Sequence, residues 1–75
     1  MEIAKVLDAT GLACPMPIVR AKKTMETIGT GEILEIHTTD EGSKSDLTAW
    51  AKSGGHELLE QTKEDQVFKF WIKKA

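Results

Sequence analysis

The sequence predicts a two-layer α/β sandwich in which two helices cover one face of a four-stranded mixed sheet. Three observations lead to this prediction. Glycines and prolines divide the chain into short elements, apolar residues in these elements switch between strand-like and helix-like spacing, and the last two elements have the pattern of a hairpin. The order is β-α-β-α-β-β. A helix between two strands predicts a parallel pair, and both helices can pack on the same face of the sheet.

The first strand and the first helix flank a short loop. Residues 2–9 are predicted as the strand and residues 10–13 as the loop. The helix is predicted to open within 14–17, because proline is favoured at the first helical position, and Gly29 is suited to end it. Helical spacing predicts an apolar face of Ile18, Ala21, Met25 and Ile28 and an opposite face of Arg20, Lys23, Thr24 and Thr27.

The second strand and the second helix follow. Residues 32–39 have the clearest strand pattern, because Leu34, Ile36 and Thr38 alternate with Glu35, His37 and Thr39. Residues 40–42 are predicted as a turn. Ser43, with an aspartate three positions later, matches a capping box at the start of a helix that Gly54 and Gly55 would end.

The last two elements have the sequence pattern of a β-hairpin. Residues 56–62 and 67–74 are predicted strands joined by the polar residues 63–66. Phe68, Phe70 and Ile72 share one face, which we expect to be the core. Trp71 falls on the other face, and the helices leave that face open.

Size and composition restrict the function. We expect the 75 residues to form one domain, 1–75, that buries only about 60% of the surface its unfolded chain exposes, so chemistry is expected at a surface loop or a helix end. No apolar run is long enough to span a membrane, and the N-terminal residues lack a secretory signal pattern. The single cysteine predicts a reducing, cytoplasmic location. The net charge of −2 argues against tight, direct nucleic-acid binding.

Cys14 is the main candidate for chemistry. A lone cysteine is usually a small buried hydrophobe, but the residue before a proline avoids the helical conformation. Cys14 is therefore predicted at or just before the start of the helix, where backbone N–H groups and the helix dipole favour a thiolate.

Three functions fit such a thiol, and two others are disfavoured. A dithiol oxidoreductase would need a second, resolving cysteine. A hydrolase would need a histidine base, and the spacing of His37 and His56 places neither histidine beside Cys14. One anionic sulfur suffices for a relay that accepts and donates a sulfur atom. The alternatives are a thiol redox sensor and a non-catalytic interaction or regulatory module. No close spacing of ligands indicates a metal site, and no cofactor is expected.

The pattern Asp8-x-x-Gly11-x-x-Cys14-Pro15-x-Pro17 resembles the signature of the TusA-like (SirA) sulfur-carrier family. The likeness continues along the chain at Gly31-Glu32, Asp40, Gly42, Asp46, Leu47 and Gly55-His56. It implies the same sandwich fold and a sulfurtransferase-like carrier that works only with partner enzymes. The implied donor is a cysteine desulfurase or a rhodanese-type protein, and the implied acceptor is a downstream protein, in transfer-RNA 2-thiouridine synthesis or another sulfur pathway. Glu41 and Ser45 depart from the residues that many members carry at these positions.

The remaining candidates have supporting roles. Pro15 and Pro17 are expected to fix the helix start, and Asp8 and Gly11 are expected to shape the loop before it. Candidate docking residues for a partner are Arg20, Lys22, Lys23, Asp40 and Asp46. Basic residues such as those of this set more often form a solvated helix face than a docking surface, and turn or cap roles explain its acidic residues equally well.

Overall fold

The structure is a computed structural model that describes residues 2–13 and 15–75. Met1 and Cys14, the principal candidate of the sequence analysis, lie outside the described residues. The elements, in chain order, are β1 (Ile3–Ala9), α1 (Met16–Met25), β2 (Ile33–Thr38), α2 (Gly42–Ser53), β3 (Glu57–Glu64) and β4 (Val67–Lys73).

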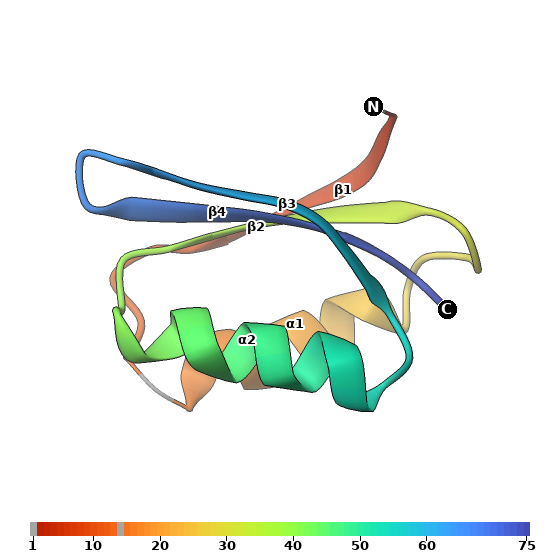
Figure 1. Cartoon of the computed structure of the whole chain (residues 1–75), viewed down its shortest axis with the longest axis horizontal. Coiled ribbons are helices and arrows are strands. Elements are labelled where there is room, and N and C mark those ends of the chain that lie inside the picture. Colours follow the sequence, from red (N-terminus) through yellow and green to blue (C-terminus); the bar gives the residue numbers. More distant parts are fainter. Residues whose placement is uncertain (1, 14) are drawn as a thin grey trace.

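The strands form one mixed sheet in the order β1-β2-β4-β3. β1 and β2 are parallel, whereas β4 is antiparallel to both β2 and β3. Figure 1 shows α1 and α2 side by side beneath the same face of this sheet. The predicted fold class is confirmed, including the parallel pair that the intervening helix required.

The core lies between the sheet and the two helices. Alternate residues of the two central strands point into it, so that Leu34 and Ile36 of β2 and Phe70 of β4 are almost completely buried. Ala21 and Met25 of α1 close the core from below. Helical spacing correctly predicted that Ala21 and Met25 are buried, whereas Ile18 is only half-buried and Ile28 lies beyond the last residue of α1. Among the described residues, the other buried hydrophobic ones are Ala9, Ile28, Leu47, Ala51, Phe68 and Ile72.

Helix α1 ends earlier than predicted. Its last residue is Met25, four positions before Gly29. The backbone N–H and the side-chain hydroxyl of Thr27 both donate to the carbonyl oxygen of Thr24, at 3.0 and 2.6 Å. These short-range bonds replace the next helical hydrogen bonds, because a threonine side chain can compete for a backbone acceptor.

The predicted capping box of α2 is wrong. Ser43 lies inside the first turn and is buried, and Glu41 occupies the cap position without a side-chain cap bond. The hydroxyl of Ser43 instead donates to Oδ2 of Asp40 at 3.1 Å. A buried hydroxyl needs a hydrogen-bond partner, and the carboxylate in the preceding turn provides one.

The hairpin is tighter than predicted. β3 continues to Glu64, so the connection consists of Asp65 and Gln66 alone, with φ angles of 47° and 70°. Two successive residues at positive φ are typical of the type I′ turn that joins twisted strands. The sequence lacks the Asn-Gly pair that usually signals this turn.

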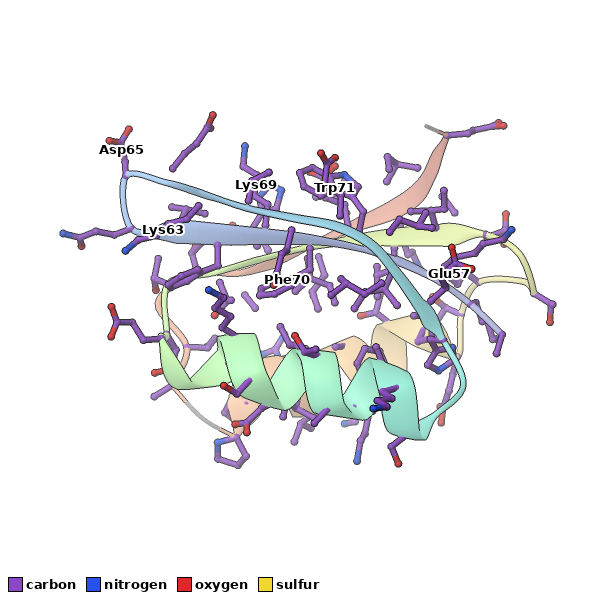
Figure 2. All side chains as sticks on the ribbon, viewed as in Figure 1. Glu57, Lys63, Asp65, Lys69, Phe70 and Trp71 are labelled. Atoms are coloured by element: carbon purple, nitrogen blue, oxygen red, sulfur yellow. The ribbon has the colours of Figure 1, made fainter. Side chains whose placement is uncertain are left out.

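Trp71 lies on the open face of the sheet, as predicted. Figure 2 shows Trp71 and Lys69 on the side of the sheet away from the helices and Phe70 on the helix side. The indole Nε1 of Trp71 donates to Oε1 of Glu35 at 2.7 Å, and Oε2 of Glu35 lies 2.5 Å from Nε2 of His37. Burial tends to raise the pKa of Glu35, but the hydrogen bonds from His37 and Trp71 outweigh it and hold that pKa below its usual value.

The lowered pKa of Glu35 predicts a loss of stability in acid. The ionised carboxylate stabilises the fold above its unfolded pKa, and this contribution is lost as the pH falls through the lower folded pKa. We expect the wild type to lose more stability than Glu35→Gln between about pH 5 and pH 3, measured by urea unfolding. Glu57→Gln, which changes an exposed glutamate of β3, controls for the loss of one negative charge. Equal pH dependence in wild type and Glu35→Gln would contradict the prediction.

Candidate functional site

The loop from Thr10 to Pro15 links β1 to α1 and carries the candidate cysteine. Its last residue, Pro15, occupies the cap position of α1 with φ −96° and ψ 10°. The amide of Met16 donates to the carbonyl oxygen of Ala13 at 2.9 Å, and the amide of Val19 donates to that of Pro15 at 3.2 Å. The helix start is thus held by one backbone bond between the residues that flank position 14 and by one bond within the first turn.

Fewer N–H groups are free at this helix start than the sequence argument assumed. Pro15 and Pro17 have no N–H, and the N–H of Met16 is already bonded within the loop. If Cys14 forms an anion as predicted, we therefore expect direct hydrogen bonds from these amides to contribute less to its stabilisation than the dipole of α1. We expect a smaller effect than at a helix whose first amides all face the ligand.

The two prolines have different surroundings. Pro15 is exposed, whereas Pro17 is among the most completely buried residues of the chain. Both positions suit proline at a helix start, but Pro17 also fills space in the core. The role of both prolines in fixing the helix start stays a prediction, and the burial of Pro17 adds a packing role that the sequence did not indicate.

The difference in burial separates the effects of the two prolines on stability. Pro17→Ala removes buried ring carbons and is expected to lower the free energy of unfolding by about 1–2 kcal/mol. Pro15→Ala removes exposed carbons and is expected to cost less than about 1 kcal/mol. Urea unfolding of the two single variants measures both values. A larger cost for Pro15→Ala would show that the burial of Pro17 has been misjudged.

Asp8 and Gly11 both lie near the start of the loop, and each has a local feature that bears on its shape. Oδ1 of Asp8 accepts hydrogen bonds from the hydroxyl and the amide of Thr10, at 2.6 and 3.0 Å. These two bonds lower the pKa of Asp8. Gly11 has a φ of +79°, a conformation that other residues rarely adopt. The amide of Gly11 donates to Oγ1 of Thr39 at 2.9 Å, across 28 positions of sequence.

The candidate docking residues are spread over the molecule. Arg20, Lys22 and Lys23 are all exposed on α1. Lys22, however, borders a shallow cleft with Trp50 and His56, near the end of α1 that is distant from the loop. Lys22 is seven residues from Pro15, a separation of roughly 10 Å along a helix axis.

The two acidic docking candidates lie in and after the β2–α2 turn. Asp40 is half-buried and accepts the hydrogen bond from Ser43, so it has the turn role that was the alternative interpretation. Asp46 is half-buried within α2. Neither carboxylate is as accessible as the basic residues of α1, and their docking role stays a prediction.

An apolar surface lies beside the loop and was not predicted from the sequence. Met16 and Val19 of α1 are 40% and 37% exposed, among the most exposed large apolar side chains of the described residues. Pro15 is exposed next to them. We call Pro15, Met16 and Val19 the α1 apolar surface. The signal in the sequence was that Met16 and Val19 lie outside the predicted apolar face that contains Ile18, Ala21 and Met25.

Two features of the described residues bear on metal binding and on membrane insertion. Among residues 2–13 and 15–75, no group of three or more histidine, aspartate or glutamate side chains is placed to hold a metal ion. Within the same part of the chain, no helix has the length and apolar character needed to cross a membrane.

Comparison with known families identifies the chain. The model of the family described as "Sulfurtransferase TusA" matches residues 5–74. The chain belongs to the TusA family. The match includes β1 from Lys5 onward, the loop, the start of α1 and the hairpin, so the resemblance inferred from the loop motif is confirmed over almost the whole sequence.

Relatives and a solved structure agree with membership of the TusA family. The "Putative sulfur carrier protein YrkI" of Bacillus subtilis is 66% identical over the full length of both chains. The "Sulfur carrier protein TusA" of Allochromatium vinosum is 49% identical over 92% of this chain and 91% of its own. The crystal structure of a SirA-like protein from Desulfitobacterium hafniense superposes with a TM-score of 0.82 at 28% identity, over 92% of this chain and 95% of that one.

Some of these relatives are much longer than this chain. The "Putative sulfur carrier protein YrkF" of Bacillus subtilis is 54% identical over the full length of this chain. The aligned part makes up only 40% of that relative's own length. The same sequence unit therefore also occurs as part of a larger protein.

Proposed function

We propose that this chain is a sulfur carrier that accepts a persulfide sulfur on Cys14 from a donor protein and passes it to an acceptor protein. The observation that carries the proposal is the TusA family match, which extends on both sides of the only cysteine of the sequence. Relatives that cover the same residues are named sulfur carrier proteins.

The proposed chemistry is two successive exchanges at a sulfur–sulfur bond. The Cys14 thiolate attacks the outer sulfur of a donor persulfide, a new S–S bond forms on Cys14, and the donor cysteine leaves as a thiolate. An acceptor thiolate then attacks the outer sulfur on Cys14, and Cys14 leaves as a thiolate in turn. Each step breaks one S–S bond and forms another, so no external oxidant, metal or cofactor of the carrier is required.

The proposal implies two protein partners and a reducing compartment. The donor would be a cysteine desulfurase or a rhodanese-type protein, and the acceptor a protein with its own reactive thiol. A free Cys14 would persist in the cytoplasm. We further propose that residues 1–75 act as one domain, since the elements share a single core.

The α1 apolar surface is the proposed docking site for these partners. Pro15, Met16 and Val19 offer apolar area directly beside position 14 in the sequence, and Arg20 and Lys23 add positive charge on the same helix. Interfaces commonly combine an apolar centre with a polar rim. A partner with an apolar centre and an acidic rim around its reactive cysteine would fit this surface.

Loading by a donor tests the proposed function. The purified protein is incubated with a cysteine desulfurase, its pyridoxal phosphate and cysteine, and its intact mass is recorded without reductant. We expect a species heavier by one sulfur atom that dithiothreitol reverts. A reaction without desulfurase controls for persulfidation by free sulfide. If neither a desulfurase nor a rhodanese raises loading above this control, the carrier function is wrong and a redox-sensing thiol becomes the better interpretation.

Any role in transfer-RNA thiolation is expected to run through a partner enzyme. The net charge of −2 does not provide the basic surface that neutralises phosphates. We therefore expect no submicromolar binding of the isolated protein to transfer RNA at physiological salt, measured by fluorescence anisotropy. Tight binding that weakens steeply with added salt would contradict this expectation.

A further inference from the structure

Thr39 connects two parts of the molecule that are distant in sequence. It follows the last residue of β2, at the start of the β2–α2 turn, and its side chain is exposed. Its Oγ1 accepts the hydrogen bond from the amide of Gly11 at 2.9 Å. Gly11 lies three positions before Cys14 in the sequence. Thr39 is not part of the motif that extends from Asp8 to Pro17.

The other described bonds of the loop are local. Thr10 is held by Asp8, the amide of Leu12 donates to the carbonyl of Ala9 at 3.3 Å, and Met16 is held by Ala13. All of these partners lie within three residues of each other. The bond from Gly11 to Thr39, in contrast, connects the loop to the end of β2 and to the turn before α2.

The residues around Thr39 make it a firm attachment point. Oγ1 of the neighbouring Thr38, which is fully buried, accepts the amide of Asp40 at 3.3 Å. The Asp40 carboxylate accepts the hydroxyl of the buried Ser43. The turn that carries Thr39 is thus bonded to itself and anchored in the core on both sides.

We infer that Thr39 is a positioning residue for sulfur transfer, which holds the Gly11 segment of the loop and thereby fixes the approach of the Cys14 sulfur to a partner's persulfide. This inference rests on the proposed function and adds a residue to it. Displacing a reacting group by about 1 Å can reduce a rate by about two orders of magnitude, so we expect the loss of this bond in the short loop to slow transfer.

Because this bond is exposed, its loss should affect transfer more than stability. In Thr39→Val, water can take the place of the hydroxyl as the partner of the Gly11 amide, so unfolding is expected to change little. We expect the maximal rate of sulfur uptake from a desulfurase to fall about tenfold, with an unchanged KM for the donor. Thr39→Ser keeps the accepting oxygen and should restore the rate.

A matched control removes a similar hydroxyl elsewhere. The exposed Thr30 donates through Oγ1 to the carbonyl of Ala75 at 3.2 Å, away from the loop. Thr30→Val should leave sulfur uptake unchanged. A rise in KM with an unchanged maximal rate in Thr39→Val would show that Thr39 contacts the donor directly, and an unchanged rate would show that the bond to Gly11 has no role. Either result overturns the inference.

A second measurement needs no donor protein. The rate of alkylation of Cys14 by iodoacetamide is followed against pH in wild type, Thr39→Val and Thr39→Ser. We expect the midpoint to move in the valine variant toward the value of a free cysteine, about 8.5, and to return in the serine variant. If no donor loads the wild type but this shift is seen, the proposed function fails and only the effect of Thr39 on the surroundings of the Cys14 thiol stands. Superimposable profiles for all three proteins would refute the positioning role.

Discussion

Cys14→Ser is expected to abolish sulfur uptake and leave the fold unchanged. Cys14 is the only thiol in the sequence, so no other side chain can form the persulfide. Serine is of similar size, and its hydroxyl is suited to the start of a helix. The circular dichroism spectrum should therefore match that of the wild type, while the species heavier by one sulfur atom should be missing from the intact-mass spectrum.

The matched control for this variant is Met16→Ser. It changes an exposed neighbour on α1 and keeps the thiol. Met16→Ser should still be loaded, with a higher KM if the α1 apolar surface docks the donor. Loading of Cys14→Ser above the donor-free control would place the sulfur on a different group, and the account of Cys14 would be wrong.

Phe70→Ala is expected to have the largest effect on stability. Phe70 is only 1% exposed and points from β4 toward the helices (Figure 2). Truncation of a buried phenylalanine costs about 3–5 kcal/mol, a large part of the 5–10 kcal/mol or so that stabilises a domain of this length. We expect urea to unfold this variant at a much lower concentration than the wild type.

Val6→Ala is the control for the core truncation. Val6 of β1 is 56% exposed, so its truncation should change the free energy of unfolding by less than about 0.5 kcal/mol. Similar losses in Phe70→Ala and Val6→Ala would contradict the assignment of the two faces of the sheet.

The parts of the fold that could be predicted depend on local patterns. The alternation of Leu34, Ile36 and Thr38 with polar residues shows directly which face of β2 is buried. The spacing of Ala21 and Met25 does the same for α1. These signals come from the covalent geometry of strands and helices, so they need no knowledge of distant contacts.

The errors arose where side chains compete with the backbone or bind far along the chain. The hydroxyl of Thr27 helps to end α1 early, and Ser43 bonds Asp40 instead of capping α2. In both cases a short polar side chain had several possible partners, and the local pattern does not show which of them it takes. The prediction of a hairpin was right, but its turn conformation at Asp65 was not evident from the sequence.

The candidate site was also predicted only in part, because only some of its residues are marked by local sequence patterns. The residue types of Pro15, Pro17 and Gly11 predict local roles, and the structure places both prolines at the start of α1 and gives Gly11 a positive φ. Thr39 was missed, because its partner is 28 positions away and nothing in its own neighbourhood marks it. The exposure of Met16 was missed because it depends on how α1 packs against the sheet.

The central claim is that Cys14 both accepts and releases a sulfur atom, and a transfer experiment tests it most directly. The protein is loaded from radioactive cysteine by a desulfurase, separated from the donor and mixed with a second protein that has a reactive thiol, such as a rhodanese. We predict that the label leaves this chain and appears on the second protein in equal amount, without a reductant. Label that stays on the chain, or that leaves only as sulfide after dithiothreitol is added, would contradict the account.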